Sequence, residues 1–205
     1  MGLAPDDNGV RPLRRWTTRW WLVAGGVVLL VALGVLLTGH VLRARMLPRR
    51  FWVVEGGRLY RSSQLTFEQL AAVIKKHGIR TILNLRNPNE TDYVEEAPAA
   101  QQHGVRLVSL PISSTEPMSD EQLAVLRQLY KDPANYPILV HCERGVARTG
   151  VAVALWRIEQ QRWDPARAVE EMIASGYPAG DKNLDVRDLL LHWQRPPEGL
   201  EQDAQ

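Results

Sequence analysis

A run of 23 residues without an acidic or basic side chain, apart from His40 if it is protonated, constrains this chain more than any other feature. It extends over Trp20–Leu42 and is bounded by Arg19 and Arg43. At about 1.5 Å per residue, a helix of this length covers a hydrocarbon core about 30 Å thick. Tryptophans gather at its start, as aromatic residues do at membrane interfaces; they are Trp16, Trp20 and Trp21. We therefore predict a transmembrane helix over residues 20–42.

Two other interpretations of this run remain open. A cleavable signal peptide has an apolar region of about 7–15 residues that ends in small residues. Here the run is longer and continues into Arg-Ala-Arg-Met-Leu-Pro-Arg-Arg at residues 43–50. The third interpretation is a buried core helix. The length and the basic flank favour an uncleaved anchor that contacts the lipid bilayer.

Charge divides the chain at the same place. The net charge of +2 combines +6 from residues 1–50, which hold eight arginines and two aspartates, with −4 from residues 51–205. Because a nucleic-acid-binding domain carries its basic surface on the folded part, this division argues against that class. We predict a basic tail over 1–19, a basic juxtamembrane linker over 43–50, a globular domain over 51–195 and a flexible tail over 196–205.

The charges on the two sides of the anchor do not by themselves decide its orientation. Four arginines precede the run and four follow it. Large domains cross membranes with little regard to their charge, whereas a short basic tail tends to stay inside. We therefore expect a single-pass protein of the cell membrane with its globular domain outside the cytoplasm. The single cysteine has no intramolecular disulfide partner in either compartment.

From Phe51 onward, short apolar runs alternate with amphipathic stretches, a pattern typical of an α/β sheet flanked by helices. Capping boxes at Thr66 and Ser119 mark two helix starts, and Pro98 is expected to bend a third helix. The predicted strands are 51–54, 58–61, 79–85, 105–110 and 138–141, and the predicted helices are 66–77, 91–103, 119–130, 149–161, 164–175 and 183–193.

The chemistry is carried by the ten residues His141-Cys-Glu-Arg-Gly-Val-Ala-Arg-Thr-Gly150, between a buried strand and a helix. Successive backbone N–H groups at a helix N-terminus form a cradle for a dianion, and the helix dipole favours the same charge. We therefore predict a phosphate-binding loop made of Glu143, Arg144, Gly145, Val146, Ala147 and Arg148.

Within this segment, Cys142 is the candidate nucleophile, because the loop amides favour its thiolate form. Arg148 can present two parallel N–H groups to phosphoryl oxygens, which a lysine cannot do. Thr149 can donate its hydroxyl to the sulfur of Cys142. For His141, a role in ordering the loop and an ordinary position at the end of a strand are equally open.

The motif His-Cys-x-x-Gly-x-x-Arg-Thr-Gly resembles the signature loop of the cysteine-dependent protein tyrosine and dual-specificity phosphatases. Shorter segments agree in order, including Gly57–Ser62, Ile82–Arg86 and Val108–Pro111. The chain is most similar to small bacterial members with an N-terminal export or anchor segment. The resemblance implies a dual-specificity-phosphatase-like sheet flanked by helices, a phosphocysteine intermediate on Cys142, a phosphorylated protein as substrate, and no metal or organic cofactor.

The chain departs from this family at the general acid. The family uses an aspartate on a loop before the signature, but the corresponding positions here are Ser113, Ser114 and Thr115. Glu116 is the nearest carboxylate and Asp120 the next, so both are candidate acids. A missing acid costs least when the leaving group is itself acidic, and the tyrosine phenol, with a pKa of about 10, is far more acidic than an alcohol. Phosphotyrosine is therefore the favoured substrate.

Other functions remain possible from the sequence. A lipid phosphatase is suggested by the anchor and its flanking arginines, and a non-catalytic phosphate-binding module by the displaced acid. A rhodanese or an arsenate reductase would also place a cysteine in an anion-binding loop, but the Arg-Thr-Gly ending favours neither. The sequence leaves the physiological substrate and the oligomeric state undetermined.

Overall fold

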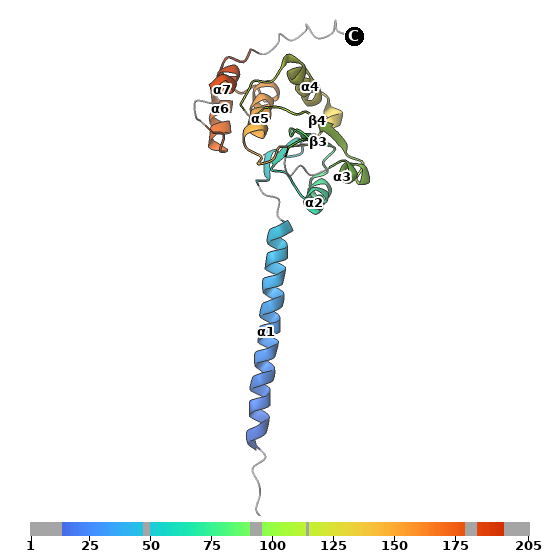
Figure 1. Ribbon diagram of the computed structural model, residues 1–205, viewed down its shortest axis with the longest axis vertical. Helices are drawn as coiled ribbons and strands as arrows, with labels where there is room; N and C mark the ends of the chain where they lie inside the picture. The colour runs from blue at the N-terminus through green and yellow to red at the C-terminus, as the bar shows by residue number, and fades with distance from the viewer. Residues whose placement is uncertain (1–13, 47–49, 91–95, 114, 179–183, 195–205) are drawn as a thin grey trace, which may run out of the picture. The chain divides into compact units, whose positions relative to one another are not determined.

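The computed structural model describes residues 14–46, 50–90, 96–113, 115–178 and 184–194 (Figure 1). The chain separates into two compact units, Met1–Leu47 and Pro48–Gln205. The predicted flexible tail over 196–205 lies outside the described residues.

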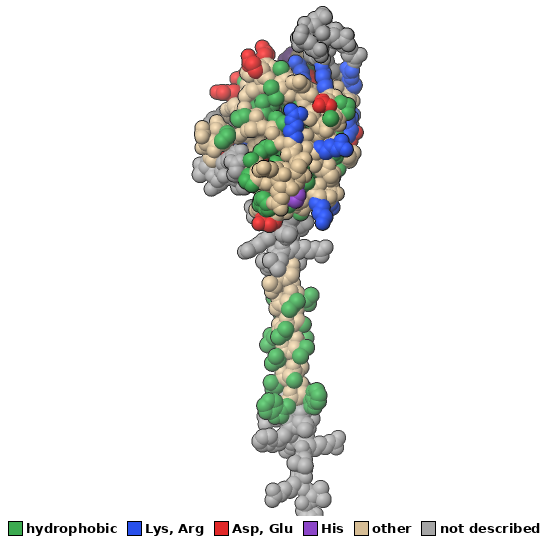
Figure 2. Space-filling model, turned by 90° about the vertical axis from the view of Figure 1, so that its right-hand side faces the viewer, with side chains coloured by type: hydrophobic (Ala, Val, Ile, Leu, Met, Phe, Trp, Pro, Cys, Tyr) green, Lys and Arg blue, Asp and Glu red, His purple; other side chains and the backbone are tan. Residues whose placement is uncertain are grey.

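The first unit contains one long helix, α1 (Arg14–Met46). It is longer than the predicted span at both ends. Within it, the 20 residues Trp20–Gly39 are long and apolar enough to cross a membrane, a criterion that an N-terminal signal sequence also meets. Their hydrophobic side chains are exposed along the helix, as the green atoms in Figure 2 show. A helix that is apolar on all sides is typical of a segment buried in a membrane or in the core of a large protein.

The second unit is built on a five-stranded sheet in the order β1-β2-β5-β3-β4. Strands β1 (Trp52–Glu55) and β2 (Leu59–Ser62) form an antiparallel hairpin, as predicted. The other strands are β3 (Thr81–Asn84), β4 (Arg106–Ser109) and β5 (Ile138–His141). The pairs β2–β5, β5–β3 and β3–β4 are all parallel. Every residue of β2, β3 and β5 is buried, as expected for central strands covered on both faces.

Helices cover both faces of the sheet (Figure 1). Leu59, Leu83 and Val140 belong to the core on one face, while Tyr60, Ile82 and Leu139 belong to the core on the other, as strand alternation requires. The first core includes residues of α4 (Asp120–Lys131), α5 (Ala147–Gln160), α6 (Pro165–Ala174) and α7 (Leu184–Leu191), and the second includes residues of α2 (Phe67–His77) and α3 (Ala97–Gln102).

Local capping signals were reliable guides to the helix ends. Thr66 and Ser119 form complete capping boxes, and Gly78 ends α2 with φ of 63°. The prediction for Pro98 is wrong, because this proline lies in the first turn of α3 and does not bend a longer helix. Its fixed φ and missing N–H suit a helix start. Residues 91–95 of that predicted helix lie outside the described residues.

Candidate active site

Three neighbouring parallel strands bring polar residues together at their carboxyl ends. His141, the last residue of β5, is in register with Ser62 of β2 and Asn84 of β3. Cys142 follows directly and is buried. The chain then forms a tight loop and enters α5, which begins at Ala147, two residues earlier than predicted. We call residues 142–148 the phosphate loop.

The phosphate loop is packed closely against the segment after β2. Gly145 has φ of 68°, and a β-carbon there would lie 2.5 Å from the backbone oxygen of Ser62 and 2.6 Å from the backbone nitrogen of Ser63. Only glycine satisfies both conditions. The backbone N–H of Gln64 donates to the backbone oxygen of Glu143 at 3.1 Å. The loop conformation is thus fixed by backbone contacts from a distant part of the chain.

A buried arginine supports the same loop. Arg61 of β2 donates from Nη2 to the backbone oxygen of Gly145 at 2.9 Å, and its side chain is only 3% exposed. Burial lowers the pKa of Arg61 and outweighs the charges of Glu171 and Cys142, which favour its protonated form. The guanidinium group of Arg61 thus lies close enough to Cys142 to interact with it electrostatically.

Arg148 lies in the first turn of α5 and is held by a carboxylate from the segment after β3. Its Nη1 and Nη2 donate to Oε1 and Oε2 of Glu90, the second bond measuring 3.1 Å. Arg86 also donates from Nε to Glu90 at 3.0 Å. Hydrogen bonding from Arg148, the largest effect, lowers the pKa of Glu90 to about 2. Glu90 is therefore ionised at neutral pH.

The contacts of Arg148 leave one side of its guanidinium group available. Burial lowers the pKa of Arg148, but the bond to Glu90 and the negative charges of Cys142, Glu90 and Glu143 raise it above its usual value. Among the described residues, Arg148 donates from Nη1 and Nη2 to Glu90 and, at 3.5 Å, from Nη1 to the backbone oxygen of Leu85. Its Nη2 also lies 3.9 Å from Oε2 of Glu143, which is too long for a hydrogen bond. Nε and the second hydrogen of Nη2 are the parallel pair left to bind two oxygens of one anion.

His141 participates in a buried polar cluster. Its Nε2 lies 3.0 Å from Oε2 of Glu96, which also accepts a hydrogen bond from Nδ2 of Asn84 at 3.0 Å. All three side chains are buried. The cluster ties the start of α3 to the ends of β3 and β5, directly before Cys142. Oε1 of Glu96 and Nδ1 of His141 are buried without a hydrogen-bond partner among the described residues, so the cluster is satisfied only in part.

The phosphate loop opens into a cavity that contains Cys142 and Arg148. Thr115 of the preceding loop and Arg50 also contribute to its wall. The residues that line it are Arg50, Thr115, Cys142, Glu143, Arg144, Val146, Ala147, Arg148, Gly176 and Pro178. Five of the six predicted phosphate-loop residues therefore line one cavity, and the sixth, Gly145, shapes the loop behind it.

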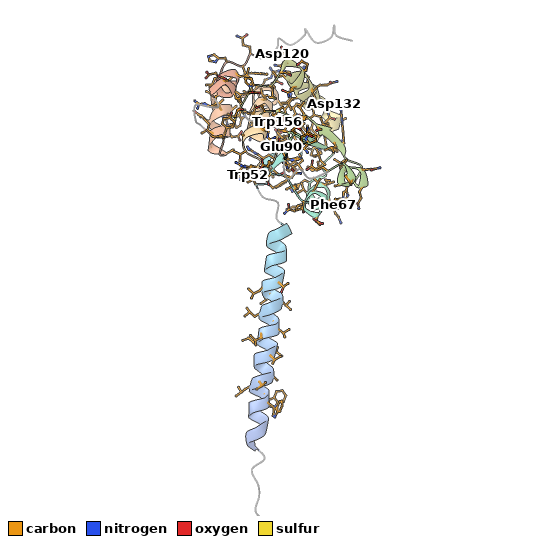
Figure 3. All side chains as sticks on the ribbon, viewed as in Figure 1. Trp52, Phe67, Glu90, Asp120, Asp132 and Trp156 are labelled. Carbon is orange, nitrogen blue, oxygen red and sulfur yellow. The ribbon has the colours of Figure 1, made fainter. Side chains whose placement is uncertain are left out.

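The predicted acid loop, residues 110–120, is organised differently. The hydroxyl oxygen of Ser113 accepts backbone N–H bonds from Thr115 at 3.2 Å and Glu116 at 3.1 Å. Glu116 and Asp120 are both exposed, and neither lines the cavity, whereas Thr115 does. In Figure 3, Asp120 lies well apart from Glu90. Ser114 lies outside the described residues.

The predicted role of Thr149 is not tested by these contacts. Its side chain is fully buried, and within the described structure its Oγ1 has no hydrogen-bond partner. The described residues also contain no group of three or more His, Cys, Asp or Glu side chains able to hold a metal ion.

Three supporting residues were missed by sequence reasoning: Arg61, Glu90 and Glu96. Arg61 and Arg86 are charged residues at the ends of apolar strands, and such placement is a usable signal. Glu90 and Glu96 carry no such signal for the active site, because Arg148 and His141, the site residues that they contact, are more than 40 residues away in sequence.

Comparison with known proteins gives a consistent result. The family model described as "DSP-PTPase phosphatase fused to NAD+ Kinase" matches residues 54–186. The chain is 36% identical over 134 residues to the dual specificity protein phosphatase TpbA of Pseudomonas aeruginosa, which covers 65% of this chain and 57% of TpbA. It is 27% identical over 157 residues to the inositol diphosphatase SIW14 of Saccharomyces cerevisiae, covering 75% of this chain and 54% of SIW14. The chain thus spans just over half the length of these relatives.

Solved structures of the same two proteins share the fold. The core catalytic domain of the SIW14 PP-IP phosphatase, in complex with citrate, matches with a TM-score of 0.60 at 27% identity, covering 72% of this chain and 87% of that domain. A TpbA variant in complex with phosphotyrosine matches with a TM-score of 0.52 at 30% identity, covering 65% of this chain and 83% of that structure.

Proposed function

This chain belongs to the dual-specificity-type protein tyrosine phosphatase family, and we propose that it hydrolyses phosphate monoesters, with phosphotyrosine in proteins as the preferred substrate, through a phosphocysteine on Cys142. The observation that carries the proposal is the cavity in which Cys142 and Arg148 lie on one tight loop at the N-terminus of α5.

In the first step, the thiolate of Cys142 attacks phosphorus, an S–P bond forms, and the P–O bond to the leaving group breaks. The transferring group carries its negative charge on three oxygens. Nε and Nη2 of Arg148 bind two of them, and the N–H groups of the phosphate loop and the first turn of α5 stabilise the developing charge. Glu90 holds the guanidinium from its other side.

In the second step, water attacks phosphorus, Glu116, which is ionised after the first step, takes a proton from the water, and the S–P bond breaks. This releases inorganic phosphate and restores the thiolate. The hydroxyl of Thr149 is proposed to donate to the sulfur as it departs. Arg61 supports the loop in both steps through its hydrogen bond to the backbone oxygen of Gly145. His141 is a positioning residue in this scheme, since its bond to Glu96 orders the strand end that precedes Cys142.

The proton for the leaving oxygen comes from Glu116 in this proposal. Glu116 adjoins Thr115, which lines the cavity, whereas Asp120 lies in the exposed first turn of α4. An acidic residue in that first turn also complements the helix dipole, and this explains Asp120 without a catalytic role. An exposed carboxylate is a weak general acid, so substrates with acidic leaving groups are favoured.

Phosphotyrosine is supported by this leaving-group argument and by the likeness to TpbA, whose variant was solved with phosphotyrosine. A second candidate is a small phosphate ester such as a phosphorylated inositol, which the likeness to the inositol diphosphatase SIW14 favours. A lipid phosphatase and a phosphate-binding module without turnover are the remaining alternatives.

We further propose that Trp20–Gly39 anchors the catalytic unit to the cell membrane as a single span, with that unit outside the cytoplasm. The length and composition of the helix support the anchor. The arginine-rich tail before the span supports the orientation. Protease protection of the catalytic unit in intact cells, and its digestion in disrupted cells, would contradict this orientation.

The function is tested by hydrolysis of an aryl phosphate and of phosphotyrosine peptides by the chain in detergent, beside the Cys142→Ser and Arg148→Ala variants. We expect turnover by the wild type and none above background by Cys142→Ser. Turnover that survives Cys142→Ser would overturn the mechanism, and binding without turnover by the wild type would favour the non-catalytic module.

A further inference from the structure

Arg50 occupies an unexpected place in the catalytic unit. It is the last residue of the basic segment 43–50, yet it lines the same cavity as Cys142 and Arg148. A β-carbon at Gly176 would lie 3.8 Å from Nη1 of Arg50, so the guanidinium lies beside the turn that follows α6. The backbone of Arg50 has φ of 51°, an uncommon conformation for a residue other than glycine. The side chain of Arg50 is exposed and lies at the cavity wall.

Two arginines near Cys142 are held by hydrogen bonds, and Arg50 is not. Arg61 donates to the backbone of Gly145, and Arg148 binds Glu90. Arg144 lies 3.6 Å from its exposed neighbour Glu143. Within the part of the chain that the structure describes, the Arg50 guanidinium has no hydrogen-bond or ion-pair partner. Its donors are thus free for a ligand, as are those of the exposed Arg144, but Arg50 is the one that the phosphate loop itself does not carry.

The charges around the cavity indicate what such a ligand carries. One phosphate dianion in the loop is matched by Arg148, the loop amides and the helix N-terminus. Arg50 lies outside that set, so its charge is not needed for the transferred phosphate. A guanidinium binds carboxylates and phosphates through two parallel hydrogen bonds. Its free donors favour a second anionic group on the same substrate.

We propose that Arg50 forms a second anion subsite beside the phosphate loop, and that the enzyme selects phosphate esters with another carboxylate or phosphate next to the hydrolysed group. This inference rests on the proposed phosphatase function. An acidic residue that flanks phosphotyrosine and a second phosphate on an inositol ring both supply this chemistry. Arg50 is then a specificity-determining residue supplied by the segment that leads from the membrane helix into the domain.

Binding tests the subsite without turnover. Calorimetry on the Cys142→Ser chain in detergent would compare inorganic phosphate with pyrophosphate, which carries the second anionic group. Because hydrogen bonds between charged groups are stronger than those between neutral ones, we expect Arg50→Ala to weaken pyrophosphate binding about tenfold or more and phosphate binding by about twofold at most. Arg80→Ala, an exposed arginine at the opposite end of β3, is the matched control and should change neither. Equal losses for both ligands, or no loss for pyrophosphate, would overturn the proposal.

Turnover then identifies the source of the second anion. One pair of substrates is a phosphotyrosine peptide with flanking glutamates and its glutamine counterpart; the other is an inositol bisphosphate and a monophosphate. A selective loss of kcat/KM in Arg50→Ala on either doubly anionic substrate supports the subsite and names its source. If Arg50→Ala causes no selective loss of kcat/KM on either doubly anionic substrate, the proposed subsite is overturned. If no substrate shows Cys142-dependent turnover, the proposed function fails, while the calorimetric result still decides whether the subsite exists.

Discussion

The phosphate loop and the acid loop both border the catalytic cavity, but they are held in place very differently. The phosphate loop is fixed by groups that are distant in sequence: the buried Arg61, the backbone after β2, and the half-buried Glu90 through Arg148. The acid loop is held by short-range bonds around Ser113 and by Gln122, which donates from Nε2 to the backbone oxygen of Pro111 at 2.7 Å. The core thus determines the position of the nucleophile and of Arg148, whereas the acid depends on local contacts at the surface.

The largest effect short of removing the nucleophile should come from Arg148→Lys. Lysine keeps the charge but cannot both bind two phosphoryl oxygens and keep the paired bond to Glu90. We expect kcat/KM on an aryl phosphate to fall about 10³-fold, as for loss of a group that stabilises the transition state. If Arg148→Lys retained more than about a tenth of the activity, bidentate binding would not be the role of Arg148.

Gly145→Ala should have the next largest effect. Its β-carbon would come within 2.6 Å of the backbone after β2, and φ of 68° disfavours alanine as well. We expect kcat/KM to fall by about 10²-fold, because a displacement of about 1 Å in a catalytic group costs that much. Gly57→Ala is the control for φ alone, since Gly57 has φ of 75° and open space around it. Comparable activity losses in the two variants would show that close packing of the phosphate loop is unimportant.

Glu90→Gln tests whether the carboxylate of Glu90 holds Arg148 in place. Its effect on the free energy of unfolding should depend on pH. The pKa of Glu90 is about 2 in the folded protein, below its ordinary value of 4.5, so its pairing stabilises the fold above about pH 4.5, and this contribution is lost as pH falls toward 2. We expect the variant to be less stable by about 1–3 kcal/mol at pH 7, with about tenfold lower kcat/KM. Urea denaturation should show the stability difference shrinking at low pH. A difference that does not change with pH would contradict this pairing.

The smallest effects are expected in the acid loop. A well-positioned general acid contributes roughly 10²–10⁴-fold, so the exposed Glu116 should contribute less, about tenfold on a phosphotyrosine peptide. The loss in Glu116→Gln should be smaller still on p-nitrophenyl phosphate, whose leaving group is more acidic. Asp120→Asn is the matched control and should change kcat/KM by about twofold at most. A larger loss in Asp120→Asn than in Glu116→Gln would reassign the acid.

The same contrast explains what the sequence could predict. The helix ends at Thr66, Gly78 and Ser119 and the strand at 138–141 were predicted correctly because their signals are local: caps, a left-handed glycine and a short apolar run. The position of Cys142 and Arg148 on one loop follows from a single ten-residue motif, so it too was within reach.

The contacts that support the site could not be predicted, because they join residues that are far apart in sequence. Glu90 meets Arg148 across 58 residues, and Glu96 meets His141 across 45, so neither pair leaves a pattern in a single sequence. Arg50 was assigned to a juxtamembrane linker by its neighbours in sequence, whereas the fold places it at the cavity wall. Local chemistry could be inferred from the sequence, but tertiary partners could not.

The central claim is that Cys142 carries the phosphoryl group between the two steps. The most direct measurement is rapid acid quenching of the chain during turnover of an aryl phosphate, followed by digestion and mass spectrometry of the peptide that contains residues 141–148. We predict a phosphoryl adduct on Cys142 that accumulates during turnover, disappears when substrate is exhausted, and is absent in Cys142→Ser. Turnover in which no adduct forms on Cys142, or in which the phosphoryl group is found on another residue, would contradict the account.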